Sequence, residues 1–437
     1  MKTSLLTLLV VTGCGARQEM PKHEEIRVVI QATMPPTVTP IVTEAPAAKP
    51  VVDEDRVRFL ATTTLRKAPR ADADKVGIIK KGTVTILART ATAEGCTNDR
   101  WIQIAPRGWA CESASEPTTD EATQATPIAL DAPEDGSPLV PGVYGVVRGA
   151  EVSTSVRVVG GRTINGVRHV LTSSGAAVPT SAVAYFSPSR FRGVVIAKGD
   201  AMPAWIRKAG DHRKPAVTYS GPRGKKTGEL APRTVVRVLE ESDDGKFVRV
   251  TETDWVARRD LRAASLAMPP EGVGANEKWF DVDRDEQVLV AYEGKQPVYA
   301  TLVSTGKWKH ATPTVMARVG SKLLTASMNN NRGDEQYAVA DVPWTMYYDN
   351  SYALHTSYWH DGFGGPRSHG CINLAPRDAR ALYQWSSPEI PAGWIAVYGD
   401  ADNPGSLVRV HSRQMPEPAF RGYAKTMRDR SLVAATE

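Results

Sequence analysis

The sequence comprises 437 residues, of which 41% are hydrophobic and 23% are charged, and its formal net charge is +6. This composition is typical of a globular protein, and the length predicts several domains, each with its own hydrophobic core. The basic residues are scattered in short clusters that form no organised stripe, so we expect no nucleic-acid partner.

The first residues, MKTSLLTLLVVTGCGA, place one lysine before an apolar run from Leu5 to Val11. This run is too short to span a bilayer and is typical of a secretory signal. The segment VTGC, which ends at Cys14, resembles the lipobox of bacterial lipoproteins. The resemblance implies a signal peptide at residues 1–13, lipidation of Cys14, and an exported, membrane-anchored lipoprotein that faces the periplasm or cell wall. An ordinary signal peptide, in which Cys14 is incidental, is the alternative.

Two segments of low complexity are expected to connect folded parts. Residues 14–52 are rich in Pro and Thr and predict an extended tether, and residues 113–138 predict a linker.

Between these segments, residues 53–112 alternate short β-like runs with turns. They resemble a bacterial SH3-like domain through Leu65-Arg66 before a Pro-containing loop, Gly82 before a strand, and a closing GWAC. Cys96 and Cys111 lie in this segment and are candidates for a disulfide, which an exporting compartment permits and which would contribute about 3 kcal/mol.

Residues 139–270 predict a further β-rich region that includes a second SH3-like module at about residues 214–262. In this module Gly228, Thr234 and Trp255 repeat the order of Gly77, Thr83 and Trp109 in the first.

From residue 277 onward the pattern predicts a β-rich domain that ends near residue 399, followed by a C-terminal tail at 400–437. Three short strands are expected after residue 277, and a hairpin is expected at 344–358 with Asp349 and Asn350 at its turn. The segment 375–385 predicts a helix with Pro376 in its first turn.

Cys371 is the candidate nucleophile, because it lies in the segment SHGCIN at 368–373. A cysteine attacks a carbonyl as thiolate, so it needs a nearby base, and His355 and His369 are candidates. The start of the predicted helix is expected to face the sulfur and to favour its charged form. Gly370 permits a tight turn that would bring backbone N–H groups near an oxyanion.

The segment LHTSYWHDGFGGPRSHGCINL, residues 354–374, resembles the catalytic segment of the L,D-transpeptidase (YkuD-type) family. The shared pattern is a His, a loop, then Ser/Thr-His-Gly-Cys, a hydrophobic residue and Asn or Arg. One departure is TPTV at 312–315, where family members commonly have TPTG. The resemblance implies a mainly β chain in which SH3-like barrels precede a β-rich catalytic domain with a short helix after the catalytic cysteine.

The resemblance also implies roles for individual residues. Cys371 would be the nucleophile and His355 the general base, oriented by the carbonyl of Thr356. Ser368, His369, Gly370 and Asn373 would shape the site, with the N–H groups of Gly370 and Cys371 as oxyanion donors. Trp359, Tyr347 and Tyr348 are candidate substrate contacts; the two tyrosines alternate along a strand, so at most one is expected to face the cleft.

The family reaction implies peptidoglycan stem peptides as partners and no cofactor. The cysteine attacks the carbonyl of the third residue of a tetrapeptide stem, releases D-Ala, and passes the acyl group to an amine.

Three alternatives remain open. His355, His360, His369 and Cys371 could bind zinc, although their spacing matches no common ligand pair. A Cys/His cell-wall peptidase of the NlpC type would place its histidine after the cysteine, which leaves His411. The third alternative is a non-catalytic wall-binding lipoprotein built from SH3-like modules.

Overall fold

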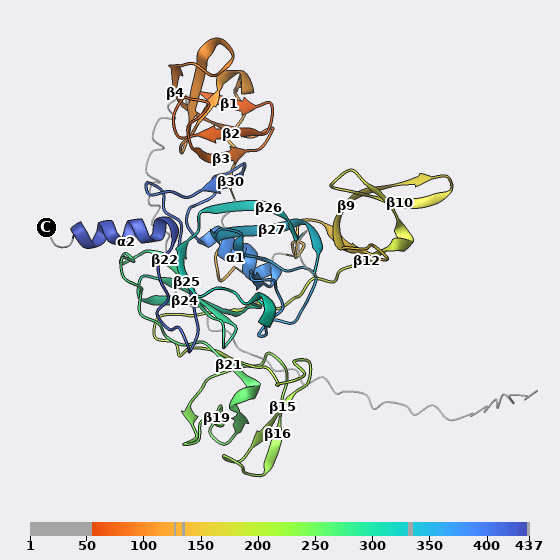
Figure 1. Ribbon diagram of the computed structural model, residues 1–437, viewed down its shortest axis with the longest axis vertical. Helices are drawn as coiled ribbons and strands as arrows, with labels where there is room; N and C mark the ends of the chain where they lie inside the picture. Colours follow the sequence, from red (N-terminus) through yellow and green to blue (C-terminus); the bar gives the residue numbers. More distant parts are fainter. Residues whose placement is uncertain (1–54, 126–127, 133–135, 331–334, 435–437) are drawn as a thin grey trace, which may run out of the picture. The chain divides into compact units, whose positions relative to one another are not determined.

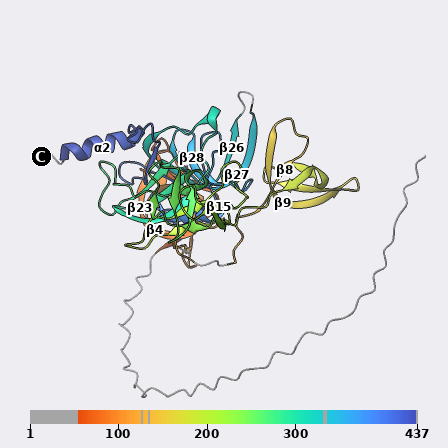
Figure 2. The same ribbon diagram turned by 90° about the horizontal axis from the view of Figure 1, so that it is seen from below.

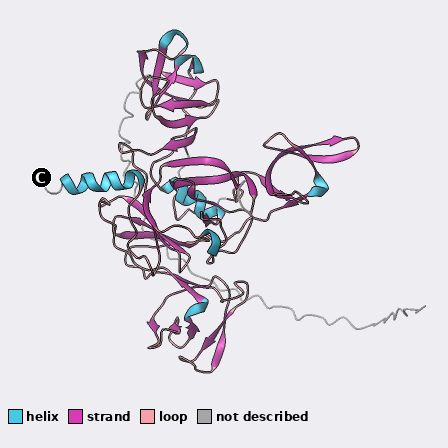
Figure 3. Cartoon of the chain, in the orientation of Figure 1, coloured by secondary structure: helices cyan, strands magenta, loops and turns pink. Residues whose placement is uncertain are grey.

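The computed structural model describes residues 55–125, 128–132, 136–330 and 335–434. The predicted signal peptide, Cys14 and the predicted tether lie outside these residues. The described chain is mainly β, with two α-helices, α1 (Pro376–Trp385) and α2 (Gly422–Ala434) (Figure 3). Neither of these helices has the length and apolar character needed to cross a membrane.

The first described segment forms a small antiparallel β unit (Figure 1), whose core also includes Trp394 and Val397 from a later strand. Its strands are β1 (Arg56–Phe59), β2 (Thr63–Arg66), β3 (Lys75–Ile79), β4 (Val84–Thr92), β5 (Arg100–Ile104), β6 (Trp109–Cys111) and β7 (Ser115–Thr118). β1 pairs with β4 and β7, and β2 pairs with β3 and β6. Cys96 and Cys111 are joined by a disulfide, which closes a short loop in this unit.

A second β segment follows at residues 143–185. Its strands are β8 (Val143–Val147), β9 (Ser153–Ile164), β10 (Val167–Thr172), β11 (Ala177–Pro179) and β12 (Val183–Tyr185). Its strands pair antiparallel with one another, and β9 also pairs in parallel with β27 (Tyr337–Asp349), which lies beside it in Figure 2. We call residues 143–186 the β8–β12 module.

Residues 204–263 form two further small sheets around a separate core. One contains β14 (Ala204–Ile206), β17 (Val235–Val236) and β21 (Leu261–Ala263); the other contains β15 (Ala216–Tyr219), β16 (Lys226–Leu230), β18 (Glu240–Glu241), β19 (Phe247–Arg249) and β20 (Trp255–Ala257). We call this segment the β14–β21 module.

The remaining strands build two sheets that enclose the largest core of the molecule. The first has the order β13 (Val194–Val195), β24 (Gln296–Leu302), β23 (Val288–Glu293), β22 (Lys278–Asp283), β31 (Leu407–His411) and β25 (Val315–Arg318). The second runs through β30 (Trp394–Tyr398), β26 (Ser321–Asn330), β27, β28 (Tyr352–Thr356) and β29 (Ile372–Leu374). Helix α1 packs against β27 and β28, and its buried residues Leu382 and Tyr383 belong to this core.

Several predictions for this part of the chain are confirmed. The three short strands are β22, β23 and β24, and the helix is α1. The hairpin consists of β27 and β28, although its turn lies one residue later than predicted, at Asn350 and Ser351. Val315, which stands where family members commonly have glycine, is the first residue of β25 and is fully buried.

The expected end of the domain at residue 399 leaves out a central strand. β31 lies between β22 and β25, parallel to the first and antiparallel to the second. β13, which lies about 80 residues before β22 in the sequence, adds a further strand at the edge of this sheet. It does so by pairing with β24, where Val194 lies opposite Ala300.

Candidate active site

Cys371 lies at the end of a tight turn that leads directly into β29. Ser368 holds this turn closed, because its hydroxyl accepts a hydrogen bond from the Gly370 N–H at 3.0 Å and donates one to the Cys371 carbonyl. Gly370 has φ = +117°, and a Cβ at this position would overlap the ring of Tyr352. Only glycine therefore fits this position, and the turn presents the thiol at a fixed place.

The N–H of Gly370 is thus already engaged. The resemblance implied that the N–H groups of Gly370 and Cys371 both bind an oxyanion, but the first of these donates to the Ser368 hydroxyl. The N–H of Cys371 is the remaining candidate donor.

His355 reaches the site from the neighbouring strand. β28 and β29 pair in parallel, with Leu354 opposite Ile372 and His355 opposite Asn373. The imidazole is 2% exposed, and its Nδ1 lies 2.9 Å from the carbonyl oxygen of Thr356. A carbonyl only accepts, so this contact assigns the ring proton to Nδ1 and leaves Nε2 as a proton acceptor. The Thr356 carbonyl therefore has the orienting contact that the resemblance implied.

Burial controls the charge state of both groups. It raises the pKa of the Cys371 thiol to about 11, against the opposing effect of the Ala353 backbone N–H. Burial also lowers the pKa of His355 to about 4. Near neutral pH the resting pair is therefore a thiol and a neutral imidazole.

The start of helix α1 does not face the Cys371 sulfur, so the predicted stabilisation of the thiolate by the helix is not found. α1 begins at Pro376, and β29 separates it from Cys371. An extended strand advances about 3.3 Å per residue, so it carries the chain away from the sulfur before the helix begins.

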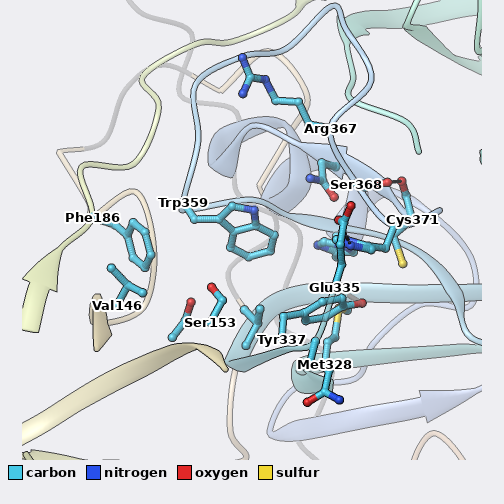
Figure 4. A pocket seen from close by; sticks show the side chains of 16 residues that line it. Val146, Ser153, Phe186, Met328, Glu335, Tyr337, Trp359, Arg367, Ser368 and Cys371 are labelled. Atoms are coloured by element: carbon cyan, nitrogen blue, oxygen red, sulfur yellow. Dashed lines mark hydrogen bonds and ion pairs between the residues drawn. The ribbon is translucent and has the colours of Figure 1, made fainter. Parts of the chain in front are cut away.

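Cys371 and His355 line one cavity of about 510 Å³. Figure 4 shows Val146 and Phe186 at one side of this cavity and Cys371 at the other, with Trp359 between them. We call it the active cavity. Its lining residues are Val146, Ser153, Ser155, Phe186, Met328, Glu335, Gln336, Tyr337, Val339, His355, Trp359, Arg367, Ser368, His369, Cys371 and Asn373.

Most of the predicted site residues lie on this lining: Cys371, His355, Ser368, His369, Asn373 and Trp359. Tyr348 is instead 5% exposed and packs in the hydrophobic core, so it is not available to a substrate. Tyr347 is half-buried, and it is not part of the lining either. The alternation of the two tyrosines places only one of them in the core.

Sequence reasoning missed two groups of lining residues. Met328, Glu335 and Tyr337 come from β26, β27 and the segment that joins them, and Val146 and Phe186 come from the β8–β12 module. Val146 and Phe186 belong to the module that pairs with the catalytic domain through the parallel strands β9 and β27. No local sequence pattern signals a pairing over such a distance.

The side-chain amide of Asn373 has one atom within hydrogen-bond distance of His360 and one atom without a hydrogen-bond partner among the described residues. Its Nδ2 position lies 2.9 Å from Nε2 of His360, whereas its Oδ1 is buried with no hydrogen-bond partner among the described residues. Since Asn373 lines the active cavity, its amide leaves one hydrogen-bonding group for a bound molecule.

Three side chains of metal-ligand type lie close together here, and two of them, Glu335 and His369, line the active cavity. One ligand atom from each of His310, Glu335 and His369 comes within 4.8 Å of the others. Glu335 already accepts hydrogen bonds at 2.7 Å from both His369 and Lys307. Among the described residues, the zinc ligands considered from the sequence do not form such a group, since only His369 belongs to it.

Comparisons with known proteins find one family match and several similar solved structures. Residues 277–411 match the YkuD family, described as the L,D-transpeptidase catalytic domain. The solved catalytic domain of the L,D-transpeptidase from E. faecium is 23% identical, and the match covers 31% of this chain and 98% of that chain with a TM-score of 0.25. The L,D-transpeptidase from Mycobacterium smegmatis is 16% identical, and the match covers 63% of this chain and 100% of that chain with a TM-score of 0.26.

No curated protein matches the chain. The family match assigns residues 277–411 to the YkuD family of L,D-transpeptidase catalytic domains.

Proposed function

We propose that the protein is a peptidoglycan L,D-transpeptidase that uses Cys371 as nucleophile and His355 as general base. The observation that carries this proposal is the contact between His355 Nδ1 and the Thr356 carbonyl. Because Nδ1 donates its proton in this contact, Nε2 of His355 is unprotonated and can accept a proton from the thiol. His355 and Cys371 lie on the same cavity, inside the segment that matches the family.

In the first half of the reaction, a tetrapeptide stem acylates the enzyme. Cys371 Sγ attacks the carbonyl carbon of the third residue, and its proton passes to Nε2 of His355. The Cys371 N–H donates to the developing oxyanion. When the tetrahedral intermediate collapses, the C–N bond to D-Ala breaks, and His355 returns the proton to the departing amine. A thioester and free D-Ala result.

In the second half, an amine attacks the thioester. His355 takes a proton from the attacking nitrogen, the C–S bond breaks, and the proton returns to the sulfur. The product is a new amide, either a 3→3 cross-link or an attachment to a protein, and the thiol is regenerated. Each step conserves protons and electrons without a cofactor.

A neutral resting pair suits this sequence of proton transfers. A thiol of pKa about 11 is un-ionised near neutral pH, so the proton has to move during the attack. An imidazole of pKa about 4 is unprotonated and ready to accept it.

The alternative peptidase mechanism receives no support from His411. Its Nε2 lies 3.2 Å from Asp281, on the paired strands β31 and β22, and the residue does not line the active cavity. A non-catalytic wall-binding protein would have no need for His355 and Cys371 on one cavity.

The N-terminal features extend this proposal to where the enzyme is located in the cell. Cys14 would carry a lipid that anchors the enzyme near its polymeric substrate, and the SH3-like resemblance at 53–112 and at about 214–262 would supply wall-binding modules.

The direct test is to incubate the protein with a tetrapeptide muropeptide and to measure product masses. We expect a cross-linked dimer together with stoichiometric release of D-Ala, and we expect neither product with Cys371→Ala. Product formation by Cys371→Ala at a rate near that of the wild type would show that the nucleophile is another group.

A further inference from the structure

A second cavity, of about 510 Å³, adjoins the active cavity and carries an excess of positive charge. It is lined by His212, Arg213, Pro232, Arg233, Asp361, Gly362 and Arg367. Arg367 lines both cavities, directly before Ser368 of the catalytic turn. We call this second cavity the cationic pocket. The β14–β21 module supplies His212, Arg213, Pro232 and Arg233, and the loop after His355 supplies Asp361, Gly362 and Arg367.

Glycines in the loop 360–367 make room for two guanidinium groups. A Cβ on Gly362 would overlap the guanidinium of Arg367, and a Cβ on Gly364 or Gly365 would overlap that of Arg207. No positive φ is found at Gly362 or Gly365, so the backbone there does not itself require glycine. The space that these glycines provide is occupied by the two arginines.

Neighbouring acids balance only part of the positive charge of the pocket, and Arg213 lies 3.7 Å from one of them, Asp211. Arg233 forms a bidentate pair with Asp361, which is the one carboxylate on the lining. Arg367 makes no ion pair with any described carboxylate, and Arg207 contacts only a backbone carbonyl, that of Phe363 at 3.4 Å. Arg367 on the lining, and the neighbouring Arg207, which is not itself on the lining, thus remain without a counter-charge among the described residues.

These cations lie close enough to repel one another. Burial, followed by repulsion from Arg262, Arg367 and Arg233, lowers the pKa of Arg207 to about 10. Burial likewise lowers the pKa of His212, and the surrounding arginines contribute to the shift. A fold that holds like charges together gains free energy when an anion binds between them.

We propose that the cationic pocket binds carboxylate groups of the peptidoglycan stem whose acyl bond is placed at Cys371. This inference rests on the proposed function, because it takes the stem peptide as the substrate. A stem peptide carries several carboxylates along its length, and the planar guanidinium fork matches a carboxylate through two parallel hydrogen bonds. Arg367 belongs to both cavities, so a chain that occupies the active cavity can place a carboxylate beside it.

The test compares a tetrapeptide stem with the same stem whose carboxylates are converted to amides. Binding to the Cys371→Ala protein is measured by isothermal titration calorimetry, so that no turnover occurs. We expect the free-acid stem to bind at least tenfold more tightly than the amidated stem. Arg367→Gln and Arg207→Gln should each reduce this preference several-fold, whereas Arg367→Lys should retain part of it.

Two further variants separate the pocket from general effects of charge and folding. Arg237→Gln removes an exposed arginine of the same module that lines neither cavity, and it should leave the preference unchanged. Gly362→Ala keeps every charge but displaces the Arg367 guanidinium, so it should weaken binding as Arg367→Gln does. The thermal unfolding midpoint of each variant shows whether it is folded, and Gly362→Ala or Arg367→Lys serves if Arg207→Gln does not fold.

Equal affinity for both stems, or a preference that survives Arg367→Gln and Gly362→Ala, would overturn the inference. Inorganic phosphate serves as a competing probe, and if it binds through Arg207 and Arg367 more tightly than the free-acid stem, the carboxylate assignment is wrong. Turnover of the wild type separates this failure from that of the proposed function. Equal KM for both stems rejects the pocket alone, whereas no cross-linked product from either stem rejects the transpeptidase.

Discussion

Cys371 and His355 are the two reacting residues of the proposed mechanism, and the structure places both in surroundings that favour their neutral forms. Burial raises the pKa of the thiol and lowers that of the imidazole. The sequence singled out both residues as candidates, because the motif and its spacing are local, and the contact of His355 with the Thr356 carbonyl agrees with what the family resemblance implied. It was not sufficient to predict the charge state, since burial depends on elements far away in the chain.

The raised thiol pKa predicts how Cys371 reacts with a neutral alkylating reagent. The rate of modification by iodoacetamide follows the thiolate fraction, so it should rise almost tenfold per pH unit between about pH 7 and pH 10. Mass spectrometry of the peptide that contains Cys371 measures this rate. A rate that is already constant between about pH 6 and pH 9 would indicate a resting thiolate–imidazolium pair instead.

The buried histidines predict a loss of stability in acid. His360 has its pKa lowered to about 3, first by burial, and it accepts a hydrogen bond from the Gly362 N–H. As the pH falls below about 6.5, the unfolded chain binds a proton at this histidine that the folded chain does not. The free energy of unfolding should therefore fall by about 2 kcal/mol for this group between pH 6.5 and pH 5.

Urea unfolding at about pH 7 and pH 5 measures this loss, and His360→Gln provides the comparison. The variant should lose less stability than the wild type over this interval, because the buried imidazole is absent. Identical losses in both proteins would show that His360 is protonated in the folded state.

At the scale of elements, the hairpin of β27 and β28 and the helix α1 were predictable, because each has a local pattern: alternation with a turn, and a proline before an apolar face. β13 was not predictable, since two residues carry no pattern and their pairing with β24 spans about 100 residues. β31 was assigned to the tail because its partner strands, β22 and β25, lie far earlier in the sequence. In the structure β31 lies inside its sheet, between these two strands.

The β8–β12 module packs against the loop that follows His355. Tyr144 of this module stacks on Tyr358 with ring centroids 4.1 Å apart, and its hydroxyl donates to the Asp341 carbonyl at 3.1 Å. Tyr358 is fully buried and lies edge-on to Trp359, which in turn lies 5.9 Å from the His355 ring between centroids. The module thus contacts the catalytic loop one residue before an aromatic lining residue.

This contact predicts two graded losses of stability. Tyr144→Phe removes one hydrogen bond and should lower the free energy of unfolding by about 1 kcal/mol. Tyr144→Ala also removes a buried ring and should lower it by about 3–5 kcal/mol. Tyr185→Ala, at a position of the same module that is 52% exposed, is the control and should change it by less than about 0.5 kcal/mol. If chemical denaturation gave the same stability for Tyr144→Ala and Tyr185→Ala, the stacking would not contribute.

For the whole molecule, the mainly β class and the catalytic domain near the C-terminal end were predictable from the sequence. The sharing of one cavity between the catalytic domain and the β8–β12 module was not. Such a shared cavity depends on long-range strand pairing, which composition and periodicity do not report. The predicted lipoprotein signal lies outside the described residues and stays a prediction.

Anchoring through Cys14 predicts where the protein is found. Two or more acyl chains, at about 0.8 kcal/mol per buried CH₂, should keep the protein with membranes through a high-salt wash. Cys14→Ala should release the protein or block its processing, as cell fractionation followed by immunoblotting will show. A wild-type protein that is entirely soluble, with a mature N-terminus that does not begin at Cys14, would refute the lipid anchor.

The most direct test of the central claim is the intact mass of the protein after incubation with a tetrapeptide stem in the absence of an amine acceptor. The account predicts a mass increase equal to the stem minus D-Ala, located on the peptide that contains Cys371 and absent from Cys371→Ala. A pentapeptide stem, which presents a different bond, should acylate poorly. Release of D-Ala with no adduct at Cys371, or equal use of the pentapeptide, would contradict the account.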